Sequence, residues 1–502
     1  MVQNVKTQHT HDTTRLSHLE ATAAVGDVPT QLLIGGEWIS AKGGRTFDVM
    51  DPATEEVLAA VSDGDIAEAI AAVDAAEEAA ADWKATSPRR RSDILMKCFH
   101  LMNDQAERLA RMITAENGKA LPDARSEVTY AAEFFRWYAE EAVRAPGELG
   151  PAPAGANQIM VTHEPIGIAV LVTPWNFPAA MATRKIAPAL AAGCTCILKP
   201  AAETPLTALA IGEIMRQAGV PAGVVNIVTT TKAGPVVSAM LHDKRVRKLS
   251  FTGSTGVGRR LLHEAADQVI SCSMELGGNA PFIVFDDADV ETAVAGAMVA
   301  KMRNGGEACT AANRFYVQKR ILAEFMRRFA EEMAALKVGP GLAADTQLGP
   351  LITEAAVAKV ERLVDDAIAK GARLVTGGSR LGGEGFYYLP TVLAHVSPDA
   401  EILREEIFGP VAPIIAFDTE DEVVELANDT EYGLVSYVFS RDLKRALAVA
   451  GRLESGMVGI NRGVVSDAAA PFGGMKQSGL GREGSNHGML EYLETKYIAA
   501  TW

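Results

Sequence analysis

The sequence has few cysteines and no long apolar run. Only five cysteines occur in 502 residues, and they lack the regular spacing of a disulfide-stabilised secreted domain. No stretch approaches about 20 uninterrupted apolar residues, the length that a transmembrane helix needs. The segment from Met1 to Thr14 is polar and lacks the apolar core of a secretory signal peptide. These absences predict a cytoplasmic protein that does not associate with a membrane.

Clustered positive charge is also scarce. The formal net charge is −15, and the longest basic run is the short segment from Arg89 to Arg91. A nucleic-acid-binding surface needs clustered lysine and arginine, so no nucleic-acid partner is expected. Hydrophobic residues make up 48% and charged residues 22%, as in ordinary soluble enzymes. The length of 502 residues predicts two or three domains.

Strand-like and helical patterns alternate regularly in the middle of the chain. Apolar strand-like runs occur at Ile168 to Val172, Cys194 to Leu198, Val224 to Val228 and Arg247 to Thr252. This series predicts βαβ units around a buried parallel sheet, and a second α/β series begins near Gly277. Long helical patterns precede the first series, over residues 65–83, 89–117 and 124–143. The predicted fold class is therefore α/β.

A single cysteine, Cys309, has the surroundings of a nucleophile. It lies in Asn304-Gly-Gly-Glu-Ala-Cys309-Thr-Ala-Ala-Asn-Arg314, between an apolar helical run and a strand-like segment. Small neighbours leave room for a ligand beside the sulfur, and functional loops tend to occupy such junctions. A cysteine thiolate is a strong nucleophile, although a lone cysteine is more often a small buried hydrophobic residue. This stretch alone leaves both interpretations open.

Three other stretches carry groups that suit a nucleophilic cysteine. Asn176 lies in a proline-bracketed loop at the end of a strand, and its amide can donate to an oxyanion. Glu275 ends an apolar strand, where a carboxylate is costly to bury without a function. The turn Gly253-Ser-Thr-Gly-Val-Gly258 precedes a predicted helix over residues 259–266 and can approach a pyrophosphate. It reads G-x-x-G-x-G instead of G-x-G-x-x-G, so a tight turn without a ligand is an open alternative.

Together these stretches resemble the aldehyde dehydrogenase superfamily from about Gln31 to the C-terminus. The matching strings are Pro174-Trp-Asn-Phe-Pro178, Phe251-Thr-Gly-Ser-Thr-Gly256, Glu275-Leu-Gly-Gly-Asn279, the Cys309 stretch, Glu405-Glu-Ile-Phe-Gly-Pro410 and Pro471-Phe-Gly-Gly474. The resemblance implies a Rossmann-like cofactor domain, an α/β catalytic domain and a small oligomerisation β-sheet. It also implies that the Gly253 turn is the family's own variant of the dinucleotide turn.

The resemblance implies domain boundaries as well. The NAD(P)-binding domain would take residues 30–140 and 166–276, the catalytic domain 277–477, and the oligomerisation or bridging segments 141–165 and 478–502. Residues 1–29 are polar and are expected to form a disordered tail. The exposed edge of the small sheet implies self-association as a homodimer or a homotetramer.

The implied catalytic residues are Cys309, Asn176 and Glu275. The Cys309 thiolate would attack the aldehyde carbon, while the Asn176 side chain and the Cys309 backbone N–H would hold the oxyanion. Hydride transfer to the nicotinamide would leave a thioester, and Glu275 would activate the water that hydrolyses it. No metal is expected.

The implied cofactor-binding residues are Thr173, Pro174, Trp175, Lys199, Ala202, Gly253, Ser254, Glu406 and Phe408. Lys199 would contact the adenosine ribose, Ser254 the pyrophosphate and Glu406 the nicotinamide ribose. NAD-preferring relatives commonly carry a glutamate three residues after the lysine, where this chain has Ala202 and only then Glu203. A 2′-phosphate meets less repulsion without that carboxylate. The predicted cofactor is NADP or NAD, with NADP slightly favoured.

Within the family the chain is most similar to succinate-semialdehyde dehydrogenases. Arg184, Arg303 and Ser466 match the residues that bind the remote carboxylate of the substrate in that group. The alternative for the two arginines is an ordinary exposed position, since charged side chains usually face water. The predicted reaction is the oxidation of succinate semialdehyde to succinate.

Other interpretations stay open at this stage. The substrate is alternatively another ω-carboxy or amino aldehyde, such as glutarate semialdehyde. A CoA-acylating enzyme is less compatible with Glu275 as an activator of water. From a different class, the chain is alternatively a catalytically silent binding protein on the same scaffold. Two departures from the family pattern are Glu307, in place of a glutamine, and Ala311, in place of a second cysteine that some relatives carry.

Overall fold

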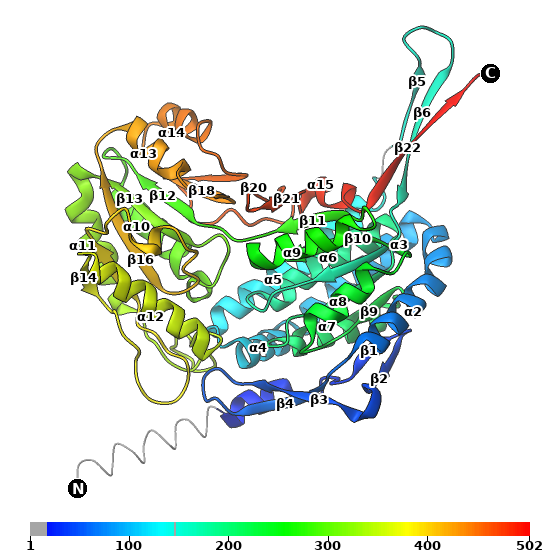
Figure 1. Ribbon diagram of the computed structural model, residues 1–502, viewed down its shortest axis with the longest axis horizontal. Helices are drawn as coiled ribbons and strands as arrows, with labels where there is room; N and C mark the ends of the chain where they lie inside the picture. The colour runs from blue at the N-terminus through cyan, green and yellow to red at the C-terminus, as the bar shows by residue number, and fades with distance from the viewer. Residues whose placement is uncertain (1–17, 145–146) are drawn as a thin grey trace.

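An eight-stranded sheet organises the first half of the molecule (Figure 1). The computed structural model describes residues 18–144 and 147–502. The order across the sheet is β2 (Glu37–Ile39), β1 (Leu32–Ile34), β9 (Val225–Ile227), β8 (Cys196–Lys199), β7 (Ile168–Val172), β10 (Val246–Thr252), β11 (Ser271–Glu275) and β21 (Gly479–Leu480). The five strands from β9 to β11 are mutually parallel. From β7 the chain adds β8 and β9 toward one edge of the sheet, and it then returns to add β10 and β11 toward the other edge. The strand order therefore reverses between β7 and β10, which is the Rossmann-like arrangement.

Two helical layers cover the faces of this sheet. Ala169 and Leu171 of β7 belong to one core cluster, whereas Ile168 and Val170 belong to another, as the two-residue period of a strand requires. The first cluster contains α3 (Pro88–Asp104), α4 (Ala106–Asn117), α5 (Leu121–Glu141), α6 (Pro178–Ala192) and α7 (Pro205–Ala218). The second contains α2 (Ile66–Ala85), α8 (Ala233–Leu241) and α9 (Thr255–Ala266). Burial on both faces explains why these strands are continuous apolar runs.

A seven-stranded sheet organises the second half. Its order is β14 (Arg373–Thr376), β15 (Thr391–Ala394), β16 (Val411–Phe417), β13 (Ala312–Gln318), β12 (Ala280–Val284), β18 (Val435–Phe439) and β19 (Met457–Ile460). All neighbours are parallel except the edge strand β14. Its helices are α10 (Val290–Met302), α11 (Lys319–Ala335), α12 (Glu354–Ala369), α13 (Glu420–Asn428) and α14 (Leu443–Ala450). Both sheets are parallel α/β layers, so the predicted fold class is confirmed.

The two sheets meet end to end. Strand β11 of the first sheet ends at Glu275 and β12 of the second begins at Ala280, so only residues 276–279 lie between these two strands. The carboxyl ends of the parallel strands in the first sheet therefore lie near the amino ends of the parallel strands in the second. In open α/β sheets the carboxyl ends of the strands are the usual place for ligands.

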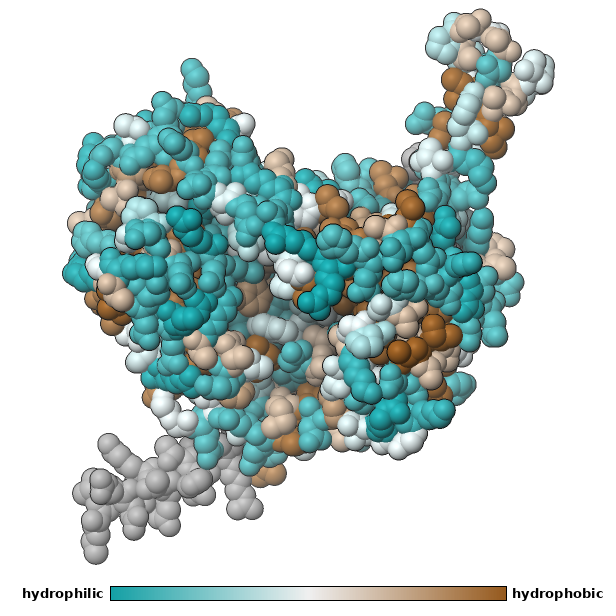
Figure 2. Space-filling view, in the orientation of Figure 1, coloured by the Kyte–Doolittle hydropathy of each residue, from teal (hydrophilic) through white to brown (hydrophobic). Residues whose placement is uncertain are grey.

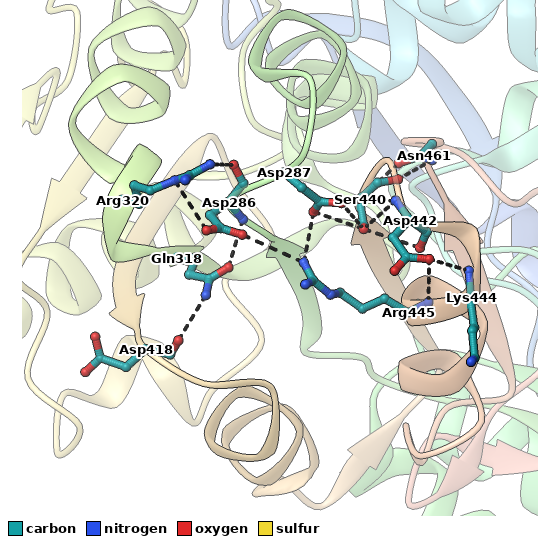
Figure 3. Close-up of polar contacts among 10 residues, drawn as sticks. All are labelled: Asp286, Asp287, Gln318, Arg320, Asp418, Ser440, Asp442, Lys444, Arg445 and Asn461. Atoms are coloured by element: carbon teal, nitrogen blue, oxygen red, sulfur yellow. Dashed lines mark hydrogen bonds and ion pairs between the residues drawn. The ribbon is translucent and has the colours of Figure 1, made fainter.

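The carboxyl ends of the second sheet are closed by a polar network (Figure 3). Asp287 accepts hydrogen bonds from the Ser440 hydroxyl at 2.9 Å and from the Asp442 N–H at 3.0 Å, and its other oxygen lies 3.1 Å from Arg445 Nη1. Gln318 joins the ends of two further strands, since its side chain binds the backbone of Asp286 and of Asp418. The polar groups of this edge are thus bound by one another and stabilise the sheet.

A small sheet projects from the body (upper right in Figure 1). It pairs β5 (Glu148–Pro151) and β22 (Leu493–Ala500) with the two sides of β6 (Gln158–Pro165). Two-stranded pairs complete the β structure: β3 (Thr46–Met50) with β4 (Val57–Ser62), and β17 (Tyr432–Gly433) with β20 (Met475–Lys476). The last helix is α15 (Ser485–Leu490). None of the described helices is long and apolar enough to span a membrane.

The structure differs from the sequence-based expectations at three places. Residues 18–25, expected in a disordered tail, are helical and bury Ala21 and Val25 in the first core cluster; residues 1–17 lie outside the described part. The predicted helix over residues 89–117 is two helices, since Gln105 between them has φ −105° and ψ 15°. Helix α9 begins at Thr255 instead of residue 259, so Gly258 lies in its first turn, where a Cβ would come within 2.4 Å of the Leu276 side chain.

Candidate active site

A cavity of about 370 Å³ lies where the strand order reverses. The loop after β7 and the turn after β10 form one wall, and Cys309, α12 and the segment around Glu406 complete it. The cavity brings together the predicted residues Pro174, Trp175, Asn176, Gly253, Ser254, Cys309, Glu406 and Phe408. Catalytic and cofactor-binding candidates that are far apart in the sequence therefore share one cavity.

A second cavity, of about 230 Å³, shares Phe177 with the first. Arg303 and Ser466 both line it, and Arg303 Nη1 donates to the Ser466 hydroxyl at 3.2 Å. The Arg303 guanidinium also lies 4.9 Å from the centre of the Phe177 ring. Two of the three predicted carboxylate-binding residues are thus neighbours beside the nucleophile loop.

The third candidate, Arg184, has a different environment. It is fully buried in α6 and lines neither cavity. Its Nε lies 2.5 Å from Glu483 Oε2, and its guanidinium stacks 4.3 Å from the Phe472 ring centre. The charge of Arg184 is therefore shared with a carboxylate of the chain itself.

Cys309 is a half-buried thiol whose pKa is affected in opposite directions by neighbouring charges. Burial raises its pKa to about 12, and the carboxylates of Glu406 and Glu275 act in the same direction. The Arg184 and Arg303 guanidinium groups oppose this shift. At neutral pH the isolated thiol is therefore protonated, and the two arginines are the groups that stabilise the thiolate.

Glu275 is a buried carboxylate at the end of β11. Burial and the neighbouring Glu483 carboxylate hold the pKa of Glu275 well above its ordinary value, and its Oε2 has no hydrogen-bond partner within the described residues. Gly473 makes room for it, since a Cβ there would lie 2.9 Å from Glu275 Oε1. Such a carboxyl group holds its proton to a higher pH than an exposed one, and its anion is a stronger base.

Glu483 has the opposite protonation preference and was not predicted from the sequence. Its carboxylate oxygens lie 2.5 Å from Arg184 Nε and 2.5 Å from Lys185 Nζ. Burial favours the neutral form, but the two cations hold the pKa of Glu483 below its ordinary value. The pair of carboxyls therefore consists of an anionic Glu483 and a Glu275 that resists ionisation.

Asn176 is held by three hydrogen bonds. Its side-chain Nδ2 donates to the Glu307 backbone carbonyl at 2.9 Å. The backbone carbonyl of Asn176 accepts from Asn304 Nδ2 at 2.9 Å and from Lys119 Nζ at 2.6 Å. A primary amide has two N–H donors, so one remains for an oxyanion in the cavity. The geometry thus preserves a neutral donor at a fixed place.

Helix α6, which follows Asn176, is capped by a residue of another helix. Its N-cap Phe177 has no side-chain acceptor, and Glu127 of α5 accepts instead from the N–H groups of Ala179 at 2.9 Å and Ala180 at 3.3 Å. Lys119 pairs with Glu127 at 2.6 Å. The only sequence signal for this arrangement is that Phe177, and not a serine, threonine, aspartate or asparagine, stands at the N-cap position directly before Pro178.

Glu307, the departure from the family pattern, links two walls of the site. Its Oε1 accepts from the Ile352 N–H at 3.2 Å, and its carbonyl accepts from Asn176 and from Asn304. Burial raises the pKa of the Glu307 carboxyl to about 8. The side chain therefore ties the nucleophile loop to the segment that leads into α12.

The first cavity fits a dinucleotide at both of its ends. Ser254 caps α9, and Gly256 in the first turn of that helix has open space where a side chain would stand, which suits a pyrophosphate. The ammonium group of Lys199, at the end of β8, is not in the lining of this cavity; burial lowers its pKa, and the Glu203 carboxylate opposes this shift. Thr173 lies beside it through a backbone hydrogen bond of 3.2 Å to the Lys199 carbonyl. Ala202 nearby carries no carboxylate.

The other end of the cavity contains aromatic rings and Glu406. The rings of Trp175 and Phe408 meet edge to face with centres 5.4 Å apart. Glu406 Oε1 accepts from the Gly278 N–H at 3.1 Å, and burial raises its pKa to about 7. An apolar wall and a hydrogen-bond acceptor beside Cys309 suit a nicotinamide riboside.

Comparison with known proteins agrees with this geometry. The Aldehyde dehydrogenase family matches residues 38–498. A succinate-semialdehyde dehydrogenase of Paenarthrobacter nicotinovorans is 53% identical over 88% of this chain and 98% of its own. A glutarate-semialdehyde dehydrogenase of Pseudomonas putida is 49% identical over 93% of this chain and 97% of its own. A crystal structure described as an E. coli NADP dependent enzyme has a TM-score of 0.93 at 48% identity, covering 95% of this chain and 98% of that one. The chain belongs to the aldehyde dehydrogenase family.

Proposed function

We propose that this NAD(P)-dependent aldehyde dehydrogenase oxidises succinate semialdehyde to succinate. The observation that carries the proposal is a pair of adjacent cavities of different chemistry, which share Phe177, with Cys309 in the lining of the first. One fits a dinucleotide, and the other presents Arg303 and Ser466 in hydrogen-bond contact. An aldehyde with a carboxylate at its far end matches a nucleophile on one side and a cation with a hydroxyl on the other.

The proposed first step is attack of the Cys309 thiolate on the aldehyde carbon. Arg184 and Arg303 stabilise the thiolate, because their positive charges oppose the effect of burial on the thiol. The carbonyl oxygen becomes an oxyanion that accepts from the free N–H of the Asn176 amide and from the Cys309 backbone N–H. When bound, the oxidised nicotinamide supplies the hydride acceptor that converts this adduct into a thioester.

Glu275 acts in the second step. It accepts a proton from a water molecule, whose oxygen attacks the thioester carbon and releases Cys309 and the carboxylic acid. The anionic Glu483 nearby disfavours a second negative charge, so the Glu275 carboxylate is a stronger base than an exposed one.

The first prediction separates the two steps. Replacement Cys309→Ala should abolish aldehyde-dependent reduction of NADP, measured at 340 nm. Replacement Glu275→Gln should leave a burst of about one NADPH per active site and then nearly stop, since the thioester accumulates. In the wild type kcat should rise with pH, because the raised pKa of Glu275 must be passed before it can act as a base. A Glu275→Gln enzyme that keeps steady turnover and the same pH profile would remove Glu275 from this role.

The second prediction concerns Arg303. Loss of a charge-assisted contact costs about 1.5–3 kcal/mol, so Arg303→Ala should raise KM for succinate semialdehyde about 10- to 100-fold. KM for butanal, which has the same chain length without a carboxylate, should stay nearly constant. Glutarate semialdehyde, after which another relative is named, is the second candidate substrate and is measured in the same assay. Equal effects on the charged and uncharged aldehydes would exclude a carboxylate contact.

The third prediction concerns the cofactor, for which we propose a preference for NADP. Ala202 places no carboxylate at the position where NAD-preferring relatives commonly carry one, although the adjacent Glu203 carboxylate acts on Lys199, and one solved relative is described as NADP dependent. Replacement Ala202→Glu should raise KM for NADP about 10-fold or more by repulsion of the 2′-phosphate, and should raise KM for NAD much less. The kcat/KM ratio for the two cofactors measures this. A wild-type ratio that already favours NAD strongly would contradict the proposal.

We also propose that the projecting sheet mediates self-association as a homodimer or a homotetramer. Strands β5 and β22 are its open edges, and hydrophobic residues are visible along the projection (Figure 2). The side chains of Leu149, Tyr497 and Ile498 on these two strands are exposed. Unpaired strand edges with apolar side chains favour pairing with another chain.

The fourth prediction tests this surface. Replacement Leu149→Lys on the edge strand β5 should lower the mass measured by light scattering after size-exclusion chromatography, because an edge lysine opposes strand pairing. The matched control is Leu447→Lys on α14, a residue with similar exposure (56% against 66% for Leu149). An unchanged mass for Leu149→Lys would place the subunit contact elsewhere.

A further inference from the structure

Tyr130 lies in the wall of the second cavity, together with Arg303 and Ser466. It belongs to α5, on the same helical face as Asp123 and Glu127, which line the cavity with it. Its ring packs edge to face on Phe134, with centres 4.8 Å apart. The ring is therefore fixed in the core while the hydroxyl end reaches the cavity wall.

The Tyr130 hydroxyl is buried, and its hydrogen has no acceptor within the described residues, since the nearby Arg184 guanidinium can only donate to the hydroxyl oxygen. A buried O–H without an acceptor costs about 1–3 kcal/mol, and buried tyrosines usually find one. The two carboxylates of the cavity do not serve it. Glu127 is bound to Lys119 and to the first turn of α6, and Asp123 accepts the Asn304 N–H at 3.1 Å. A group that enters the cavity can satisfy the hydroxyl.

Two guanidinium groups determine the charge of the group that can satisfy the Tyr130 hydroxyl. Burial raises the pKa of Tyr130, and the positive charges of Arg184 and Arg303 act against this shift, so both arginines lie close to the phenol oxygen. Cations attract the lone pairs of that oxygen and thereby turn its hydrogen away from themselves. The hydroxyl is thus left as a donor, and an anionic acceptor suits it best because the arginines attract the same charge.

We propose that Tyr130 is a substrate-binding residue that donates a hydrogen bond to the remote carboxylate of the aldehyde. It acts together with Arg303 and Ser466, which line the same cavity. Arg184 does not contact the substrate in this arrangement, but it polarises the Tyr130 hydroxyl. The ligand class is an aldehyde with an anionic group at its far end. This inference rests on the proposed function of the site.

The test is Tyr130→Phe, which keeps the ring contact with Phe134 and removes only the donor. KM for succinate semialdehyde should rise about 10-fold, as expected for one hydrogen bond to a charged group, with kcat nearly unchanged. KM for butanal should not change. The inhibition constant of succinate, which binds without reacting, should rise by a similar factor, and this readout does not depend on turnover.

The matched control is Tyr138→Phe. Tyr138 lies two turns later on α5, and its hydroxyl is also buried, but it lines neither cavity. This variant should leave both KM values unchanged. A loss of affinity that is equal for butanal and succinate semialdehyde in Tyr130→Phe would show a packing effect and overturn the proposal.

Comparison with Arg303→Ala separates the two possible failures. If Arg303→Ala weakens succinate semialdehyde selectively and Tyr130→Phe does not, the carboxylate site stands and Tyr130 is not part of it. If neither variant discriminates between the two aldehydes, the proposed substrate class is wrong, and the role of Tyr130 falls with it.

Discussion

The buried ion pair between Lys119 and Glu127 is the contact on which the active site depends most. A buried pair stabilises a protein only when its remaining donors and acceptors are satisfied, and here they are used for the site. Glu127 caps α6, while the Lys119 ammonium binds the Asn176 carbonyl and lies 4.3 Å from the centre of the Phe177 ring. Removal of either partner would leave an uncompensated charge under the loop that carries the oxyanion donor. The position of Asn176 therefore depends on α5 and on the short segment between α4 and α5 that carries Lys119.

The charged groups around Cys309 have opposing effects on its pKa. Glu275 and Glu406 raise the pKa of the thiol, and Arg184 and Arg303 lower it. Since burial adds to the effect of the carboxylates, the resting sulfur is a neutral thiol. Thiolates are the form that oxidants attack, so this balance protects the nucleophile between turnovers. Ala311 adds to the protection, because no second cysteine stands two residues away to form a disulfide.

The sequence predicted the parts of the site that lie within short strings. Cys309, Asn176 and Glu275 each follow or end a recognisable strand or helix, so their place at a sheet edge follows from local patterns. The fold class was predicted for the same reason. Partners distant in the chain could not be predicted: 57 residues separate Lys119 from Asn176, and 298 separate Lys185 from Glu483. The break at Gln105 also lacks a glycine or proline to announce it.

Among the described residues, Phe177 alone lines both cavities. In the proposed mode of binding, its ring lies between the far end of the aldehyde and the dinucleotide. Substitutions on the substrate side can accumulate without altering the nucleotide contacts, so selection can change the aldehyde while the redox chemistry is inherited intact. The division of the site by one aromatic wall offers a physical reason why closely related enzymes of this fold can differ in the aldehyde they oxidise.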